Sequence, residues 1–556
     1  MITTSSLNDI FKRIALTFAS LKKVFQNEIV DHYFSDTDIG RLYQCHPTSD
    51  GIDEQTWQDL LVADYFNLLS HQTSIFGQQV LHQRLRQGAQ SDEHKNRQER
   101  LQFLMVDPER LKALHAICKH LRMVDTEIAG MLFSGAKLPT APAWLPYAKI
   151  IPFSFMFCAL LMLIGLFALP ATKLAPIAFF CLFPITIGLF ALQLRYRETV
   201  LHWNQMMYAL TQLLGTCSLF GSRDETLFKE FSEHRKTTAK IVQKLLRFPF
   251  QLAGMGKVRD YIDWFLLSNV SHYFNQLARV ETHHHCIQTS FLRCAHLEAD
   301  IAIARHLLTR PLFCWATLHE EASFHFHEAI HPLLVNATPL SIDSNNKSIF
   351  LSGQNGIGKS TLLRTIGINL ITARAFGFCY AVSGSTALRP IYASLQNEDS
   401  LLNGESLYVS ELRRAHEVLA TIKQTNSDDG CAKKANEQQA FYIIDEIFRG
   451  TNYLESVSAA AAVLQRIALH GTVIVSSHNL VLAAILHEHF LAKYVARNVD
   501  GNLTICDGIL PKTNGISLLA THGFTLEIEA DANKVFQWLS QYLSHPTTDV
   551  DIFTTE

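Results

Sequence analysis

The spacing of apolar residues divides the 556-residue chain into three kinds of segment. Over 1–147 and again over 197–330, apolar residues recur with helical spacing, which predicts an all-α region. From about residue 345, short runs rich in β-branched and aromatic residues alternate with helical patterns, as in 347–353, 441–447 and 471–478. Strands that alternate with helices predict an α/β domain with a mainly parallel sheet, which we place at 331–530. A helix and a polar tail follow over 531–556.

Two uncharged stretches interrupt the helical region. They run from Ile150 to Ala171 and from Leu174 to Leu194, with Lys173 between them. At about 1.5 Å per residue, each stretch is long enough to cross a hydrocarbon layer of about 30 Å. The sequence therefore predicts a transmembrane hairpin over 148–196, with the lipid bilayer as a partner. The alternative is a hydrophobic helical hairpin that is buried inside a soluble protein.

The distribution of charge predicts an orientation for this hairpin. Lys149, Arg195 and Arg197 flank it, whereas Lys173 is alone in the connection. Under the positive-inside rule we expect both termini and the α/β domain in the cytosol, at the inner or plasma membrane if the protein is bacterial. Eleven cysteines without a C-x-x-C pair fit a reduced compartment. The net charge of −3 gives no overall basic excess for binding duplex DNA.

A phosphate-binding loop is predicted where the first strand of the α/β domain ends. The residues fit G-x-x-x-x-G-K-S between a strand and a helix, and they are Gly353, Gln354, Asn355, Gly356, Ile357, Gly358, Lys359 and Ser360. Glycines let the backbone turn its N–H groups onto phosphate oxygens, and the helix adds its N-terminal dipole. We expect Lys359 to reach the β and γ phosphates and Ser360 to bind Mg²⁺.

Two carboxylates follow the second apolar run. Asp445 stands at its end and Glu446 comes next. Asp445 is expected to hold the metal, and Glu446 to accept a proton from the attacking water. His478 follows the third run and could sense the γ-phosphate; the alternative is an ordinary histidine at a strand end.

These motifs and the segments between them resemble the ATPase domain of the MutS superfamily. The matching segments are 328–334, 353–381, 398–419, 443–452, 475–478 and 514–524. A looser similarity over 55–130 resembles the start of that family's helical core, or lever, region. The resemblance implies an ABC-type P-loop ATPase that uses ATP and Mg²⁺. It adds Thr361 to the phosphate loop, and it implies that Glu446, Lys359 and His478 serve hydrolysis.

The resemblance also implies a homodimer through the ATPase domains. Ser406 matches the signature serine that this family offers to the γ-phosphate bound by the opposite subunit, and Glu411 matches a signature glutamate. A site shared in this way would be complete only in a dimer, so ATP would drive closure. The alternative for 404–412 is a plain helix start, with Ser406 as its N-cap.

The departures from the family bear on the partner. Nothing before residue 55 resembles a mismatch-recognition domain, and the apolar hairpin takes roughly the place of the DNA-gripping clamp. We therefore expect a membrane-anchored MutS-like ATPase that moves helical levers, with nucleic acid as a candidate partner and no identified protein client. The alternative is an ABC-type transport or remodelling ATPase that acts on a protein or lipid. Such a half-transporter usually has about six spans and an L-S-G-G-Q signature, whereas 403–411 reads NGESLYVSE.

Overall fold

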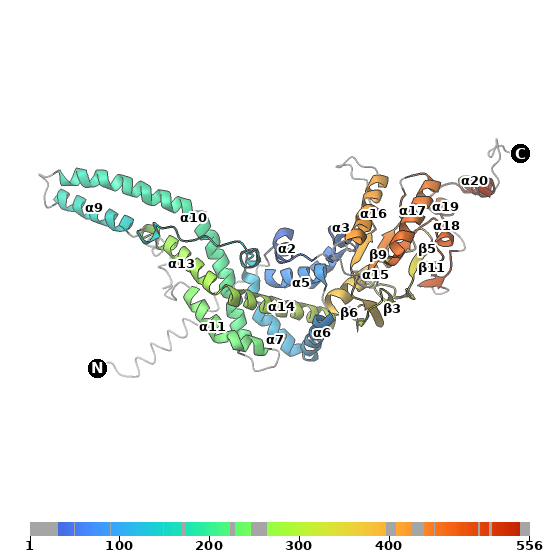
Figure 1. The fold of residues 1–556 in the computed structure, drawn as a ribbon, viewed down its shortest axis with the longest axis horizontal. Helices are drawn as coiled ribbons and strands as arrows, with labels where there is room; N and C mark the ends of the chain where they lie inside the picture. Colours follow the sequence, from blue (N-terminus) through green and yellow to red (C-terminus); the bar gives the residue numbers. More distant parts are fainter. Residues whose placement is uncertain are drawn as a thin grey trace. The chain divides into compact units, whose positions relative to one another are not determined.

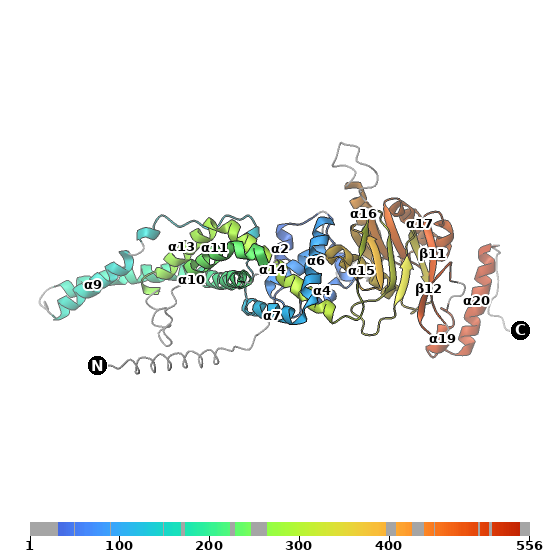
Figure 2. The ribbon, with the colours of Figure 1, turned by 90° about the horizontal axis from the view of Figure 1, so that it is seen from below.

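The computed structural model describes residues 32–48, 50–88, 91–147, 150–167, 173–222, 228–245, 264–395, 407–424, 439–449, 451–498, 501–510 and 514–544. They form two compact units (Figures 1 and 2). The helical unit comprises the chain up to His46, Ser70–His82 and Arg100–Arg305, and the α/β unit comprises Pro47–Leu69, Gln83–Glu99 and the chain from His306 onward. Two N-terminal segments therefore belong to the α/β unit. The domain boundaries that the sequence suggested stay a prediction.

The described part of the helical unit is built from helices. They are α2 (Asp36–Cys45), α7 (Pro108–Cys118), α8 (Ala129–Phe133), α9 (Ile150–Phe167), α10 (Leu174–Phe220), α11 (Lys229–Leu245), α13 (Ser268–Thr282) and α14 (His284–Leu308), with short 3₁₀ turns at Leu121–Met123 and Leu145–Tyr147. Helices α5 (Ile75–Gln87) and α6 (Ser91–Val106) each contribute to both units, and the last three residues of α14 belong to the α/β unit. The all-α character of this region follows from the helical spacing of its apolar residues.

The two uncharged stretches fold as a helical hairpin. Helix α9 contains the described part of the first, up to Phe167, while the second is the beginning of α10, which continues without a break for 47 residues (Figure 1). At the closed end the helices approach closely, since a Cβ on Gly165 would lie 2.6 Å from the backbone nitrogen of Ala175. Large apolar side chains are nevertheless exposed, for example Phe157 (62%) and Phe180 (75%). By length and composition both helices could cross a membrane, and only 11% and 17% of their apolar windows are buried.

A six-stranded sheet forms the centre of the α/β unit. Its order is β12-β11-β5-β10-β9-β8, and all neighbours are parallel except β11 and β12. The strands are β5 (Ser348–Gly353), β8 (Ile391–Ser394), β9 (Ala440–Asp445), β10 (Gly471–Ser476), β11 (Phe490–Arg497) and β12 (Leu503–Asp507). The predicted strands at 347–353, 441–447 and 471–478 are β5, β9 and β10, so the predicted α/β fold with a mainly parallel sheet is confirmed.

Helices cover both faces of this sheet, which explains why its strands read as continuous apolar runs. Tyr442 and Ile444 of β9 pack in one core with Leu464 of α17, whereas Ile443 faces Gly367 of α15. The helices of the unit are α3 (Glu54–Asp59), α4 (Val62–Ser70), α15 (Lys359–Phe376), α16 (Leu407–Gln424), α17 (Tyr453–Ala468), α18 (Val481–Ile485), α19 (Leu518–Thr521) and α20 (Leu526–Ser544).

A second sheet combines three strands that precede the phosphate loop in the chain with one, β7, that follows α15, and the sequence analysis did not predict it. Its order is β2-β7-β3-β4, and it is built from Thr317–His319, Ser383–Ala387, Phe324–Ala329 and Leu340–Asp343. A small antiparallel pair, β1 (Cys314–Trp315) and β6 (Phe378–Cys379), accompanies it. These strands are short and several carry histidine or serine, so they lack the apolar runs that mark the central sheet.

Candidate nucleotide site

The predicted phosphate loop connects β5 to α15. Gly356 (φ 72°) and Gly358 (φ 104°) adopt left-handed backbone conformations that favour glycine. Gly358 is the N-cap of α15 and supplies no side-chain cap. The first N–H groups of a helix have no partner within the helix, so here they are left for an external acceptor. With the helix dipole, this arrangement suits a bound phosphate.

Lys359 lies across the inside of this loop. Its Nζ donates to the carbonyl oxygens of Gly353 (3.1 Å) and Gln354 (3.2 Å), and lies 3.5 Å from Nε2 of His478. Burial lowers the pKa of Lys359, while the carboxylates of Asp445 and Glu446 act to raise it. The side chain that should meet the β and γ phosphates is thus already at the loop, in contact with weak neutral acceptors that a phosphate can replace.

The two predicted metal ligands meet at the carboxyl ends of their strands. The hydroxyl of Ser360 donates to the carboxylate of Asp445, although 85 residues separate them. Strand β10 lies between β5 and β9, and the three strands are parallel, so the phosphate loop and Asp445 lie at the same end of the sheet, where these strands have their carboxyl ends. A hydroxyl and a carboxylate oxygen are the hard ligands that Mg²⁺ prefers, and the pair fits that ion beside the phosphate loop.

Glu446 turns sharply away from β9. Its φ is 51°, and its N–H donates to the carbonyl of Ser476 on β10 at 2.8 Å. One carboxylate oxygen lies 2.9 Å from Nε2 of His478 and the other 3.2 Å from the guanidinium of Arg449. The hydrogen bond with His478 lowers the pKa of Glu446, burial opposes this, and the charges of Arg449 and Lys359 lower the pKa further. Glu446 is therefore ionised at neutral pH, as a proton acceptor must be.

Helix α16 reaches the same cluster through Glu411. This carboxylate is 3% exposed, accepts a hydrogen bond from the backbone N–H of Arg449 at 2.8 Å, and lies 3.6 Å from its guanidinium. Burial raises the pKa of Glu411, while Arg449 acts to lower it. Sequence reasoning singled out Glu411 through resemblance alone and gave Arg449 no role, because the left-handed turns that place Arg449 beside Glu446 have no local sequence signal.

Asn514 is the other residue at the site that the sequence analysis did not single out. Its Oδ1 accepts a hydrogen bond from the backbone N–H of Asn355, at the tip of the phosphate loop, at 2.9 Å. The late segment 514–524, which the resemblance included, thus contributes a direct contact to the loop. The Asn-Gly pair at 514–515 was the available signal, because such pairs mark turns.

The structure brings together most of the residues that the sequence singled out. Lys359, Ser360, Asp445, Glu446 and His478 form one cluster with the glycines of the loop. Ser406 lies outside the described residues, and α16 begins at the next residue, Leu407. The role of Ser406 toward a second subunit therefore stays a prediction.

Comparisons with known proteins agree with this geometry. Residues 349–540 match the family model of MutS domain V. The chain is 27% identical to endonuclease MutS2 of Thermus thermophilus over 179 residues, which is 32% of this chain and 21% of that protein. It is 24% identical to the DNA mismatch repair protein MutS of Listeria monocytogenes over 265 residues, 45% of this chain and 26% of that protein. The MutS of Thermus aquaticus is 26% identical over 219 residues, 37% of this chain and 25% of the relative.

The similarity therefore spans between a fifth and about a quarter of the length of these relatives. The family model locates its match in the C-terminal part of the chain. There the matched domain, the phosphate loop and the paired carboxylates coincide in one α/β unit. The C-terminal part of the chain, over residues 349–540, is thus a MutS-type P-loop ATPase domain, and the proteins that the chain resembles belong to the MutS superfamily.

Proposed function

We propose that this protein is a membrane-anchored MutS-like ATPase whose two ATP sites form between the ATPase domains of a homodimer. The observation that carries the proposal is the cluster at the carboxyl edge of the sheet. There the Ser360–Asp445 pair lies beside Lys359, and the ionised Glu446 is held by His478. This is the set of groups that phosphoryl transfer to water requires.

Each residue has a role that its position supports. The loop N–H groups and Lys359 bind the phosphates of ATP, and Ser360 and Asp445 would hold Mg²⁺, which neutralises charge on the phosphates when bound. Glu446 accepts the proton of the attacking water. His478 lies within reach of both Lys359 and Glu446, so it can register whether the γ-phosphate is present. Ser406 is assigned by resemblance and not by position, and it would complete the site of the partner subunit.

The α9–α10 hairpin supports the membrane anchor. Its exposed phenylalanine and leucine side chains would be unfavourable in water over two helices of this length and are stable in a hydrocarbon layer. The flanking basic residues favour a cytosolic ATPase domain. Relatives named for DNA mismatch repair make nucleic acid a candidate partner of the helical unit.

Purified full-length protein in detergent tests the ATPase. We expect turnover by the native protein, loss of nucleotide binding in Lys359→Ala, and retained binding with turnover lowered about 100- to 10,000-fold in Glu446→Gln. Lys534→Ala, which removes a solvent-exposed lysine on α20, is the matched control and should behave like the native protein. Native turnover in Glu446→Gln would reject the assigned base, and failure of the native protein to bind ATP would reject the function.

The anchor and the partner need separate measurements. Membranes that contain the protein are washed at alkaline pH, which releases peripheral proteins, and release of this chain would contradict the anchor. Turnover is then compared without DNA and with perfectly paired, branched and mismatched duplexes. Stimulation by any of them supports nucleic acid as the partner, and equal rates with all of them argue against it.

A further inference from the structure

One face of helix α3 carries three polar side chains that point at the ATPase domain. Asp53, Thr56 and Asp59 follow one another at intervals of three residues, which places them on the same side of a helix. Asp53 is the N-cap and accepts a hydrogen bond from the N–H of Thr56 at 2.7 Å. Thr56 and Asp59 are almost fully buried. Polar groups this far from water indicate a specific partner.

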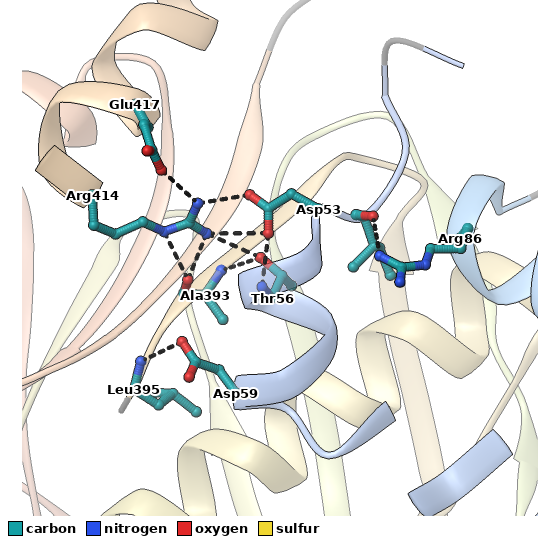
Figure 3. Close-up of polar contacts among 9 residues, drawn as sticks. Asp53, Thr56, Asp59, Arg86, Ala393, Leu395, Arg414 and Glu417 are labelled. Atoms are coloured by element: carbon teal, nitrogen blue, oxygen red, sulfur yellow. Dashed lines mark hydrogen bonds and ion pairs between the residues drawn. The ribbon is translucent and has the colours of Figure 1, made fainter. Parts of the chain in front are cut away.

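The first partner is the backbone of the edge strand β8. The N–H of Ala393 donates to the hydroxyl of Thr56 at 2.9 Å, and the N–H of Leu395 donates to the carboxylate of Asp59 at 2.8 Å (Figure 3). Alternate N–H groups of an edge strand point away from the sheet and need acceptors. Helix α3 supplies them with side chains, so the N-terminal segment 50–59 completes this edge of the ATPase sheet.

The second partner is Arg414 on α16, which is 6% exposed. Its guanidinium forms a two-pronged contact with Asp53 at 2.7 and 3.3 Å, and also donates to the hydroxyl of Thr56 at 3.2 Å (Figure 3). The same group donates to the carbonyl of Ala393 at 2.7 Å and lies 3.5 Å from Glu417. The charge of Arg414 thus joins three elements, α3, β8 and α16, at one point.

The segment is fixed from its other side by Arg86. The guanidinium donates to the carbonyl of Ile52 at 3.0 Å, pairs with Glu54 at 2.6 Å and lies 4.1 Å above the ring of Trp57. Residues 50–59 are therefore held rigidly between Arg86 and Arg414. Displacement of α16 would have to move this segment or break its contact with Arg414.

Helix α16 also contacts the catalytic cluster one turn before Arg414. Glu411 binds Arg449, and Arg449 binds Glu446. A cavity between α16 and the sheet is lined by Glu411, Arg414 and Glu446 together. Val418 of the same helix packs into the hydrophobic core, so the polar contacts of Glu411 and Arg414 position α16 in addition to its apolar packing.

We propose that Asp53 and Arg414 are positioning residues for hydrolysis, through which the N-terminal segment 50–59 holds α16 and, by way of Glu411, the turn that carries Glu446. The inference rests on the proposed ATPase function. It makes the hydrolysis step depend on the placement of a segment that continues in the chain into the helical unit at residue 70.

Steady-state turnover and nucleotide affinity of the full-length protein in detergent test the inference. Asp53→Asn keeps the helix cap and removes the charge, and Arg414→Lys keeps the charge and removes the two-pronged contact. We expect each variant to lower kcat at least about tenfold, because small displacements of catalytic groups cost up to about 100-fold. The Kd for a non-hydrolysable ATP analogue should change less than about twofold, since neither residue touches the phosphate loop. The double variant should be no slower than the slower single variant, because residues that act as a unit are not additive.

Asp507→Asn is the matched control, since it breaks the Lys493–Asp507 pair (2.7 Å) at the opposite edge of the same sheet. It should leave kcat unchanged. Unchanged kcat in both single variants, or effects that multiply in the double variant, would overturn the inference. So would a loss of analogue-binding sites in proportion to the loss of turnover, which would indicate unfolding. An inactive native protein would instead reject the proposed function itself.

Discussion

A buried carboxyl group makes the stability of the helical unit depend on pH. Glu298 on α14 is 3% exposed and accepts hydrogen bonds from the N–H and hydroxyl of Ser74, at 2.9 and 2.5 Å, where α5 begins. Burial dominates over these donors and raises the pKa of Glu298 from 4.5 to about 7. Between pH 4.5 and about 7 the folded protein therefore keeps a proton on Glu298 that the unfolded chain has already released.

The sign and size of the effect follow from proton linkage. Between pH 4.5 and about 7 the folded state binds more protons, so stability falls as the pH rises. At about 1.4 kcal/mol for each unit of pKa, the change amounts to about 3 kcal/mol. His115 in the same unit acts in the opposite sense, because burial and nearby arginines lower its pKa from 6.5 to about 4. In the native protein the pH dependence of stability that comes from Glu298 is thus partly cancelled by that of His115. A variant without the Glu298 carboxyl group is needed to isolate its contribution.

The variant Glu298→Gln has nearly the same shape and cannot titrate. We would compare thermal unfolding of the two full-length proteins in detergent from pH 4.5 to 8. From pH 8 to pH 4.5, the free energy of unfolding of the native protein should rise by about 3 kcal/mol relative to that of Glu298→Gln. At about 2–4 °C per kcal/mol, this corresponds to about 6–12 °C in melting temperature. Glu109→Gln, an exposed carboxylate on α7 paired with Lys112, is the control and should follow the native curve. Parallel pH curves for native protein and Glu298→Gln would refute the reasoning.

Three further outcomes are expected. Ser406→Ala should lower ATP turnover while the melting temperature stays within about 1 °C of native, because a serine that serves the partner subunit adds little to the stability of its own chain. Equal turnover in both proteins would contradict the shared site. Gly358→Ala should cost about 1–3 kcal/mol through strain at φ 104° and weaken analogue binding, which titration calorimetry measures. Tyr380→Phe should destabilise the protein by about 1–3 kcal/mol in a denaturant titration, because its buried hydroxyl joins Tyr65 (2.7 Å) and His306 (2.8 Å).

The central strands and the phosphate loop could be predicted from the sequence because each is encoded locally. An apolar run that ends in Asp445, or glycines before Lys359, needs no knowledge of the rest of the chain. The position of Glu446 was predictable, but its contacts were not. They depend on left-handed turns at Glu446 and Phe448 that place Arg449 beside the carboxylate. Non-glycine residues whose backbone has a positive φ leave no reliable pattern in a sequence.

The contribution of the N-terminal segments to the α/β unit is another feature that the sequence analysis did not predict. Asp53, Thr56 and Asp59 have the spacing of one helix face, yet their partners Ala393, Leu395 and Arg414 lie more than 300 residues away. A single sequence can show that these residues share one face of a helix, but it does not show which residues that face contacts. The unbroken length of α10 was not predicted either, because the charge at Arg195 ends the apolar stretch without ending the helix.

The same segment also contacts the helix that starts at the phosphate loop. A Cβ on Gly367 of α15 would lie 2.5 and 2.8 Å from the methyl carbons of Leu60, so glycine is what allows Leu60 to pack there. Arg364, one turn earlier, donates to the carbonyl of Asp59 at 2.9 Å. Residues 59–60 thus lie against α15 while Asp53 holds α16 through Arg414. Since α15 carries Lys359 and α16 reaches Glu446 through Glu411 and Arg449, one short N-terminal segment connects the helix proposed to bind the phosphates with the helix that supports the proposed proton acceptor. If nucleotide binding displaces either helix, the contacts of residues 53–60 must therefore move with it or break.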